Sequence, residues 1–324
     1  MSRSLRATKS CCVVGGGGFI GLHLVEALLA TGREVTVLDK RRPSKEVLAR
    51  GVRYIRGDCG KYEVLDAALE GATEIVDLAY ATFPKTSYEN PIDDILNNLP
   101  SSVRLLEAAR GARAQRIVFV SSGGTVYGKA QQIPIEEDHP TNPISPYGIT
   151  KLALEKYAQM FHWLRSLPVV VVRPANAYGE GQRPFVGQGF IATAMGAILL
   201  GQHVVVYGKK GTVRDYVHAD DIARGIIAAL EKGRAGTTYN IGSGIGRSNR
   251  EVLEAIEKVV RPEGFQVRVK TGPSRSFDVP VNVLSSAKLR EQTGWQPHVT
   301  WEDGLSRTWD WIRLSWDRRK SVLG

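Results

Sequence analysis

The chain has 324 residues, of which 43% are hydrophobic and 23% are charged, and its formal net charge is +10. This length allows one large domain or two interlocked ones with a sizeable core. No segment approaches the ~18 uninterrupted apolar residues of a membrane span, so we expect a soluble, folded protein. The basic residues are spread along the chain without an aromatic-interleaved patch, which argues against nucleic acid as the partner.

The first half of the chain alternates short β-branched runs with helical patterns. Strands are expected over 10–14, 34–39, 52–58, 74–80, 116–122 and 169–174, and helices over 22–30, 62–69, 91–110 and 146–164. This alternation is typical of parallel strands joined by right-handed helical crossovers. The sequence therefore predicts an α/β fold with a doubly wound parallel sheet.

Beyond Pro174 the pattern loosens into loops rich in glycine and proline. Helices are expected over 190–200, 219–231 and 250–260, and strands over 203–207, 237–241 and 265–270. We therefore divide the chain into a larger domain over 1–174, to which segments from about 203–245 return, and a smaller mixed α/β lobe over 175–324. The stretch 301–316 holds Trp301, Trp309, Trp311 and Trp316. We favour a packed terminal helix there over a membrane contact.

The cysteines are Cys11, Cys12 and Cys59. An odd number, with two adjacent in an expected buried strand, does not make a disulfide framework, so a reducing cytoplasm fits best. No Cys/His spacing resembles a metal site. The N-terminal apolar run breaks into glycines without a cleavage pattern, which indicates a first strand rather than a signal peptide.

A glycine-rich turn, GGGGFIG over 15–21, follows the first strand. Gly15, Gly18 and Gly21 suit a tight turn, close approach of the backbone to a pyrophosphate, and close packing of a helix on a strand. The N-terminus of the expected helix, which begins at Leu22, supplies free N–H groups and positive potential for phosphate. We interpret the turn as a dinucleotide site, with a purely structural glycine turn as the alternative.

The second strand ends at Asp39, whose carboxylate can accept both hydroxyls of an adenosine ribose. This carboxylate would repel a 2′-phosphate, so NAD is preferred over NADP. Lys40, Arg41 and Arg42 follow, however, and arginines at this place could hold such a phosphate. Asp58 closes the third strand and is placed to reach the adenine, although an ordinary turn aspartate is the alternative.

Tyr147 and Lys151 are four residues apart on an expected helix, so their side chains face the same way. An ammonium near a phenol, together with a positive nicotinamide ring, favours the phenolate and lowers the pKa of the tyrosine. Tyr147 is therefore the candidate acid/base. The strand end SSGGTVYG over 121–128 strengthens this interpretation.

These motifs resemble those of the extended short-chain dehydrogenase/reductases, most closely the UDP-glucose 4-epimerase group of nucleotide-sugar enzymes. The matching stretches lie in order along nearly the whole chain: VVGGGGFIG, VTVLD, RGDC, SSGGTVYG, PISPYGITK, VVRPANAYG, RDYVHADDIARG and RSFDVP. The resemblance implies a Rossmann domain that binds NAD and a lobe that binds the nucleotide sugar. It also implies inversion at C4 by transient oxidation, with Tyr147 as acid/base and Lys151 also holding the nicotinamide ribose.

The resemblance further implies two sets of contacts. For NAD these are Gly15, Gly18, Phe19, Ile20, Gly21, Asp39, Asp58, Cys59, Leu78, Ala79, Tyr80, Asn97, Ser121, Tyr147, Lys151 and Ala175. For the nucleotide sugar, a UDP-sugar in the first place, they are Thr82, Thr125, Asn176, Arg214, Arg275, Asp278 and Asn282. Arg214 and Arg275 match the arginines that grip the diphosphate, for which the paired donors of guanidinium are suited.

The chain departs from the family pattern around the sugar. Gly123 stands where a serine or threonine hydroxyl meets the sugar 4-oxygen in the family. Ser122 or Thr125 is expected to replace that hydroxyl, with Thr125 preferred and a water molecule as the other alternative. The pattern His-Leu-Ala-Ala becomes Asp-Leu-Ala-Tyr over 77–80. Asn282 stands where a bulky tyrosine narrows the pocket of some epimerases, which predicts room for an N-acetyl or carboxyl group.

Other activities of the same fold stay open. Nucleotide-sugar 4,6-dehydratases need an aspartate–glutamate pair before Val-Tyr-Gly, and Gly124-Thr125 does not supply it. A 4-ketoreductase or dehydrogenase would share Tyr147 and Lys151, although it commonly uses exchangeable NADPH. A catalytically inactive, dinucleotide-sensing protein is more remote, because it would be expected to lose one of that pair. By analogy we expect a homodimer through the helices at 91–110 and 146–164.

Overall fold

The computed structural model describes residues 9–43, 50–274 and 279–323, with side chains described as far as residue 316. Within these residues the largest element is a parallel sheet of seven strands in the order β10-β6-β5-β4-β1-β2-β3. Its strands are β1 (Ser10–Val14), β2 (Glu34–Asp39), β3 (Arg53–Arg56), β4 (Glu74–Asp77), β5 (Arg116–Val120), β6 (Val169–Pro174) and β10 (Thr238–Ile241). The strand order reverses between β1 and β4, where doubly wound folds bind their ligands.

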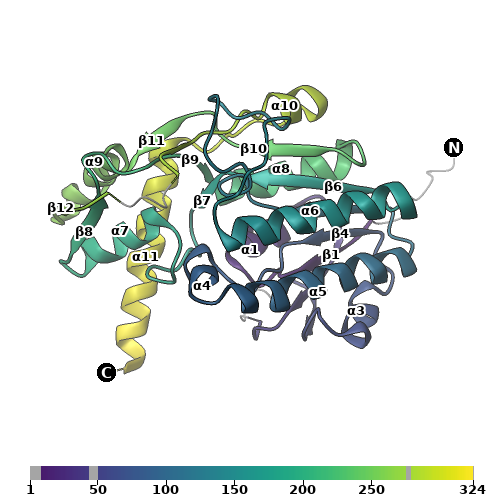
Figure 1. Cartoon of the computed structure of the whole chain (residues 1–324). Coiled ribbons are helices and arrows are strands. Elements are labelled where there is room, and N and C mark those ends of the chain that lie inside the picture. Colours follow the sequence, from purple (N-terminus) through teal and green to yellow (C-terminus); the bar gives the residue numbers. More distant parts are fainter. Residues whose placement is uncertain (1–8, 44–49, 275–278, 324) are drawn as a thin grey trace, which may run out of the picture.

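Helices cover both faces of this sheet (Figure 1). One face carries α1 (Phe19–Ala30) and α8 (Ala219–Lys232), and the other carries α3 (Tyr62–Leu69), α5 (Pro91–Gly111) and α6 (Pro146–Arg165). Along β1, Cys11 and Val13 belong to the core beneath α1, whereas Cys12 and Val14 belong to the core beneath α5. Successive side chains of a strand point to opposite faces, so an unbroken apolar run is a strand buried on both sides.

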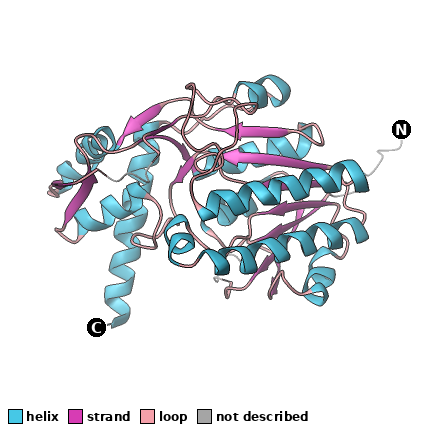
Figure 2. Cartoon of the chain, in the orientation of Figure 1, coloured by secondary structure: helices cyan, strands magenta, loops and turns pink. Residues whose placement is uncertain are grey.

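A second, smaller lobe lies at one end of the large sheet (Figure 2). One of its sheets contains β7 (Asn176–Tyr178), β9 (Val213–His218), β11 (Gly246–Ser248) and β13 (Val281–Asn282), and the other pairs β8 (His203–Tyr207) with β12 (Arg268–Gly272). Its helices are α7 (Phe190–Leu199), α9 (Asn249–Val260), the 3-10 turn η1 (Arg261–Glu263) and α11 (Trp301–Leu323). A further helix, α10 (Ala287–Thr293), packs against α8 and β10.

The predicted doubly wound sheet is confirmed, and most element bounds agree closely with the sequence patterns. Helix α1 begins earlier than expected, because Gly18 in extended conformation is its N-cap. The chain returns to the large sheet through α8 and β10, whereas β8 pairs only with β12 in the described part of the chain. The short elements α4 (Pro84–Glu89), β7, β9, β11 and β13 were not predicted. The domain boundary at residue 174 remains a prediction.

The tryptophan-rich helix α11 packs on the smaller lobe. Trp309 is 1% exposed, and its Nε1 donates to Glu263 Oε1 (3.0 Å). The Trp301 ring lies against Tyr178 and Tyr216, with ring centres 5.3 and 5.9 Å apart. These contacts support the packed helix over a membrane contact. Among the residues described, no helix is long and apolar enough to span a bilayer.

Candidate active site and dinucleotide site

The glycine-rich turn lies at the carboxyl end of β1, beside the point where the strand order reverses. Gly15 has a φ of +82°, and a Cβ atom there would lie 2.8 Å from the backbone nitrogen of Ala79. A Cβ atom on Gly21 would lie 2.6 Å from the Gly16 carbonyl oxygen. Only glycine therefore lets the strand, the turn and the helix approach this closely. No side chain in the described ranges caps α1, and no acid stands in its first turn, so its N–H groups suit an anion.

Asp39 lies directly beneath this turn and is 6% exposed. Its Oδ2 accepts hydrogen bonds from Gly17 N (3.0 Å) and Arg41 Nη2 (2.9 Å). Its Oδ1 accepts from the backbone nitrogen and Nε of Arg41, both at 2.9 Å. A Cβ atom on Gly17 would lie 3.0 Å from Asp39 Oδ2, so glycine is needed for the turn to pack on the carboxylate. The cradle and the carboxylate together fit the phosphates and ribose of a dinucleotide.

The next strand end carries Asp58 and Cys59. Partial burial opposes ionisation of Asp58, but hydrogen bonds from Gly60 N (2.8 Å) and Lys40 Nζ (3.1 Å) hold its pKa below the usual value. Burial raises the pKa of the Cys59 thiol to about 12, so this side chain is a neutral contact. Asn97 is exposed on α5, where its Nδ2 donates to Asp93 O (2.8 Å).

Tyr147 lies in the first turn of α6. The helix begins at Pro146 after Ser145, whose Oγ accepts from Gly148 N (3.1 Å). A Cβ atom on Gly148 would lie 2.9 Å from the Thr125 carbonyl oxygen, so this glycine lets the helix approach the turn that follows β5. The backbone nitrogen of Tyr147 donates to Ser87 Oγ (3.2 Å), a fully buried hydroxyl of α4. The glycine-rich turn after β1 and the first turn of α6 are therefore both held in place by close packing of the backbone.

The hydroxyl beside Tyr147 comes from Ser122. Burial raises the pKa of Tyr147 and Asp94 raises it further, while a hydrogen bond from the Ser122 side chain opposes the shift. Thr125 Oγ1 instead donates to Ser122 O (3.5 Å) within its own turn. This geometry favours Ser122 over Thr125, the residue that we preferred from the sequence. A side chain at Gly123 would meet Arg173 O at 2.9 Å, which leaves no room for the hydroxyl usual at that position.

Lys151 is 4% exposed and points toward the sheet. Its Nζ donates to Val120 O (2.9 Å) and lies 4.2 Å from the centre of the Tyr80 ring. Burial lowers the pKa of Lys151 to about 8, although the charge of Asp77 opposes this. Burial raises the pKa of Asp77 to about 6, although Lys151 opposes it in turn. The expected lowering of the Tyr147 pKa is not found in the protein alone, because burial dominates and Lys151 is engaged elsewhere.

Tyr80 contacts both expected catalytic side chains. Its ring centre is 4.8 Å from that of Tyr147 and 4.2 Å from Lys151 Nζ. Its hydroxyl lies 3.3 Å from both carboxylate oxygens of Asp94, which also accepts a hydrogen bond from Thr82 Oγ1. Asp94 is fully buried. The loop after β4, expected to contact both ligands, is thus fixed to α5 through one carboxylate.

Sequence patterns alone did not point to Asp94 or to its neighbour Asn98. Asn98 Oδ1 accepts from Ala81 N (2.7 Å), and its Nδ2 donates to Asp94 O (2.7 Å). Asp94, Asn98 and Ser102 stand one turn apart and are all buried, so they form a polar stripe on an inward face of α5. A polar stripe within an otherwise amphipathic pattern was the signal that could have identified them.

A second buried network of hydrogen bonds lies next to the turn that follows β5. Ser121 Oγ donates to the carboxylate of Glu155, which is 1% exposed and lies one turn after Lys151 on α6. Arg173 pairs with Glu155 through Nη2 (2.6 Å) and Nε (3.0 Å), and its Nη1 donates to Tyr127 OH (2.9 Å). These contacts join the ends of β5 and β6 beneath the site, and Ser121 is engaged in them.

Three of the residues expected to bind the nucleotide sugar come together. Asn282 pairs with Arg214 across β13 and β9, and its Nδ2 donates to Gly123 O (3.0 Å). Asn176 reaches the same turn, because a Cβ atom on Gly124 would lie 3.1 Å from Asn176 Oδ1. Asn282 is 2% exposed, so its amide positions the turn at Gly123. Two further expected contacts, Arg275 and Asp278, lie outside the described residues.

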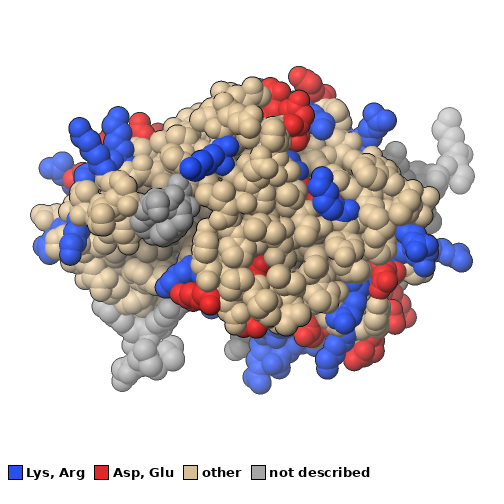
Figure 3. All heavy atoms as spheres, in the orientation of Figure 1, with Lys and Arg blue, Asp and Glu red and all other residues tan. Residues whose placement is uncertain are grey.

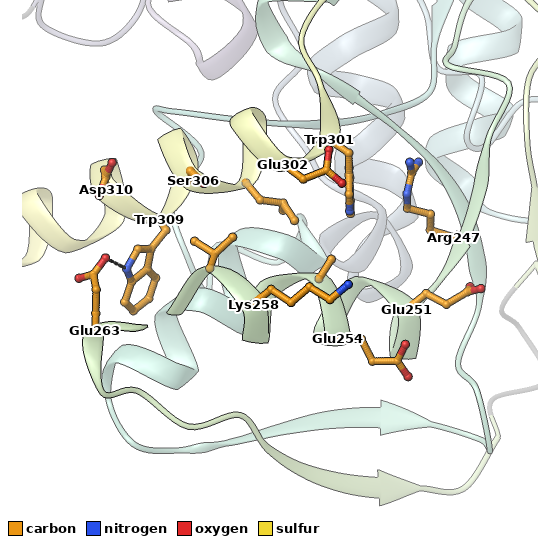
Figure 4. A pocket seen from close by; sticks show the side chains of 13 residues that line it. Arg247, Glu251, Glu254, Lys258, Glu263, Trp301, Glu302, Ser306, Trp309 and Asp310 are labelled. Carbon is orange, nitrogen blue, oxygen red and sulfur yellow. Dashed lines mark hydrogen bonds between the residues drawn. The ribbon is translucent and has the colours of Figure 1, made fainter. Parts of the chain in front are cut away.

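Two other surface features lie away from this site. A hollow of about 680 Å³ between α9 and α11 is lined by residues of the smaller lobe, with Arg247 over the Trp301 ring at 4.3 Å (Figure 4). None of the expected site residues that the structure describes lines it. On the face drawn in Figure 3, acidic and basic side chains lie mainly around the rim. Neither feature alters the location of the candidate site.

The doubly wound sheet, the glycine turn at its reversal point and the Tyr147–Lys151 pair define an extended short-chain dehydrogenase/reductase. The sequence matches the family model "NAD dependent epimerase/dehydratase family" over residues 11–242, and the chain belongs to this family. Its cofactor is NAD, which is consistent with a solved relative that contains NAD.

Relatives carry out more than one reaction. The chain is 35% identical over 308 residues to UDP-glucose 4-epimerase of Mycolicibacterium smegmatis, covering 93% of this chain and 97% of that protein. It is 34% identical over 326 residues to dTDP-glucose 4,6-dehydratase of Streptomyces niveus, covering 95% of each. The structure of UDP-glucose 4-epimerase from Thermus thermophilus in complex with NAD matches with a TM-score of 0.86 at 35% identity, covering 94% of this chain and 99% of that one. Overall similarity therefore does not choose the reaction.

Proposed function

We propose that this protein is a UDP-sugar 4-epimerase, which inverts the configuration at C4 of the sugar with NAD that stays bound. The observation that carries the proposal is the hydrogen bond between the Ser122 side chain and Tyr147. Ser122 lies on the turn after β5, and the residues that follow it, Gly123, Gly124 and Thr125, carry no carboxylate. This arrangement provides one acid/base at the sugar and no second acid on the turn. Inversion at C4 needs no more, because the proton removed is the proton returned.

The protein's own groups have distinct tasks in this proposal. NAD, when bound, supplies the acceptor and donor for the hydride at C4. Tyr147 takes the proton of the 4-hydroxyl and later returns it, while Ser122 donates a hydrogen bond that stabilises the phenolate. Lys151, with a pKa of about 8, is charged at neutral pH and gives the surroundings of the phenol a positive potential.

A 4,6-dehydratase activity is less well supported. The described carboxylate that most affects Tyr147 is Asp94, which is fully buried and already accepts hydrogen bonds from Tyr80 and Thr82. It is not placed as a free acid or base toward a substrate. Loss of water from the sugar would need such a group near the turn after β5, where this chain has Gly124 and Thr125.

A nucleotide-sugar 4-ketoreductase is the second candidate. The observation that favours it is the raised pKa of Tyr147, because a protonated phenol is the form that donates to a ketone. Such an enzyme would exchange its cofactor at each turnover. The protein would then act only with added reduced dinucleotide.

The proposed substrate contacts are Asn176, Arg214 and Asn282 together with Thr82, Arg275 and Asp278. A UDP group is supported by the relatives at about 35% identity, whose printed substrate is UDP-glucose. A UDP-N-acetylhexosamine or UDP-uronic acid is included, because asparagine at position 282 is smaller than tyrosine. Failure to act on any sugar with an N-acetyl or carboxyl group would remove this extension.

The deciding experiment incubates the purified protein with UDP-, dTDP-, GDP- and CDP-sugars without added cofactor and follows C4 by NMR. We expect inversion of at least one UDP-sugar. Formation of a 4-keto-6-deoxy product would instead identify a dehydratase, and a reaction that requires added NADPH would identify a ketoreductase. The matched control is Tyr147→Phe, which keeps the ring and removes the hydroxyl.

We also propose that two copies associate through α5 and α6 in the cytoplasm. Ile92 and Leu96 of α5 are 61% and 63% exposed, and Ile149 and Trp163 of α6 are 56% and 72% exposed. The two helices pack against each other on the same face of the sheet, and large exposed apolar side chains on such a layer are typical of an interface. Light scattering coupled to size-exclusion chromatography should give twice the monomer mass. Leu96→Asp should yield the monomer.

A further inference from the structure

The adenosine end of the dinucleotide site carries more positive charge than binding of NAD requires. Four cationic side chains lie at the ends of β2 and β3: Lys40, Arg41 and Arg42 follow β2, and Arg56 is the last residue of β3. All four are exposed, and Arg56 Nε donates to Lys40 O (3.3 Å), which ties the two strand ends together. Among the residues that the structure describes, Asp58 pairs with Lys40 and Asp39 pairs with Arg41, which leaves Arg42 and Arg56 as additional cations there.

Arg41 removes the feature that would exclude a 2′-phosphate. Its guanidinium holds both oxygens of Asp39 at 2.9 Å, so the carboxylate is presented as a neutral pair rather than as a negative charge. A lone carboxylate repels a 2′-phosphate, whereas a nearby arginine accommodates one. The planar, paired donors of guanidinium match phosphate oxygens.

Arg41 is also free to change partners. Its side chain is 56% exposed, whereas that of Asp39 is 4% exposed. Tyr54 OH donates to the Arg41 carbonyl oxygen (3.1 Å), which fixes the backbone at the strand end without fixing the guanidinium. A Cβ atom on Gly18 would lie 3.0 Å from Arg41 Nη2, so the guanidinium spans from the ribose-binding carboxylate to the start of α1.

We propose that this end of the site binds the 2′-phosphorylated dinucleotides NADP and NADPH as well as NAD. Arg41 leaves Asp39 and pairs with the 2′-phosphate, and Arg42 and Arg56 add positive potential. With NAD, the ribose hydroxyls must displace Arg41 from the same carboxylate oxygens, so Arg41 competes with NAD. Arg41 thus strengthens the binding of NADP and weakens the binding of NAD. The inference rests on the proposed location of the dinucleotide and not on the reaction at the sugar.

The test is calorimetric titration of the full-length protein with NAD and with NADP, in the absence of sugar, after any copurified dinucleotide has been removed. We expect the two dissociation constants of the wild type to lie within about tenfold. In Arg41→Ala, NADP should bind about tenfold or more weakly, the loss of a charge-assisted pair, while NAD binds as tightly or more tightly. Retained NAD binding also shows that the variant is folded.

The matched control is Arg53→Ala, which removes an exposed arginine paired with Glu70 at 3.2 Å on the same sheet edge. It changes the net charge equally and should leave the ratio of the two constants unchanged. Asp39→Asn is a second, opposite test, expected to tighten NADP and weaken NAD. NADP binding more than about a hundredfold weaker than NAD in the wild type would overturn the inference, as would equal effects of Arg41→Ala and Arg53→Ala. C4 inversion by the same preparation would leave the proposed function intact in either case.

Discussion

Charged side chains are buried at one end of the proposed dinucleotide site and exposed at the other. Around Tyr147, the side chains of Asp77, Asp94 and Lys151 are nearly or fully buried and held by specific partners. At the other end, Lys40 and Arg41 are exposed and pair across the surface. Burial fixes the positions of the first group, whereas exposure lets the second rearrange. The chemistry is therefore placed where the protein is rigid, and selection of the cofactor where it is adaptable.

Tyr147→Phe gives the largest expected effect at the buried end. Loss of the acid/base should lower the turnover number by about 10²–10⁴-fold, because no other hydroxyl in the described residues occupies its place. NAD affinity, measured by calorimetry, should change little. Normal turnover in this variant would remove Tyr147 from the mechanism.

Glu155→Gln tests the buried network beneath the site. Arg173 would remain buried without its carboxylate, which should lower the free energy of unfolding by about 3–5 kcal/mol. The matched control is Asp58→Asn, which breaks an exposed pair with Lys40 and should cost about 0–1 kcal/mol. Urea unfolding of the two variants measures the difference. Equal losses of unfolding free energy in Glu155→Gln and Asp58→Asn would show that burial does not distinguish the catalytic end of the site from the adenosine end.

Ser122→Ala and Thr125→Val separate the two candidate hydroxyls. A hydrogen bond to a charged group contributes about 1.5–3 kcal/mol, so Ser122→Ala should lower the turnover number by about 10–100-fold. Thr125→Val should lower it much less, because its hydroxyl bonds within its own turn. A larger loss of turnover in Thr125→Val than in Ser122→Ala would instead support Thr125, the residue preferred from the sequence. Dinucleotide binding serves as the control for folding in both variants.

The pH dependence of turnover reports the buried lysine. Because burial lowers the pKa of Lys151 to about 8, its ammonium is lost as the pH rises through that value, and the turnover number should fall there. Asp77→Asn removes a charge that raises this pKa, so the fall should move to lower pH. Lys151→Arg should show no fall in this range, since guanidinium stays charged. If the pH dependence of turnover in Asp77→Asn were the same as in the wild type, this would contradict the electrostatic interaction between Asp77 and Lys151.

Sequence was sufficient for features that depend on short separations along the chain. The apolar runs predicted the strands, and the confirmed sheet brings the turn at 15–21 to its reversal point. The spacing of Tyr147 and Lys151 placed both on α6. Local packing also explains why Gly21 admits no side chain, since a Cβ atom there would meet the backbone of Gly15 and Gly16, whereas the close contact at Gly15 is with the distant backbone of Ala79.

Other parts of the site depend on contacts that no local pattern encodes. Thr125 was preferred over Ser122 from the sequence, and only the path of the backbone directs Ser122 to Tyr147. Asn282 reaches Gly123 because β13 pairs with β9 far along the chain. The sequence places Asp39 and Arg41 two residues apart, but it does not show that the Arg41 guanidinium binds both oxygens of the Asp39 carboxylate, because this depends on side-chain geometry.

The most direct test of the central proposal is inversion of a UDP-sugar in D₂O without added dinucleotide, with NMR observation of C4. We expect product that carries protium at C4, because the hydrogen leaves the sugar and returns to the same carbon without meeting solvent. Deuterium at C4 would show that the hydrogen exchanges as a proton and would contradict the oxidation–reduction route. The absence of inversion with every UDP-sugar, from a protein that still binds NAD, would contradict the epimerase itself.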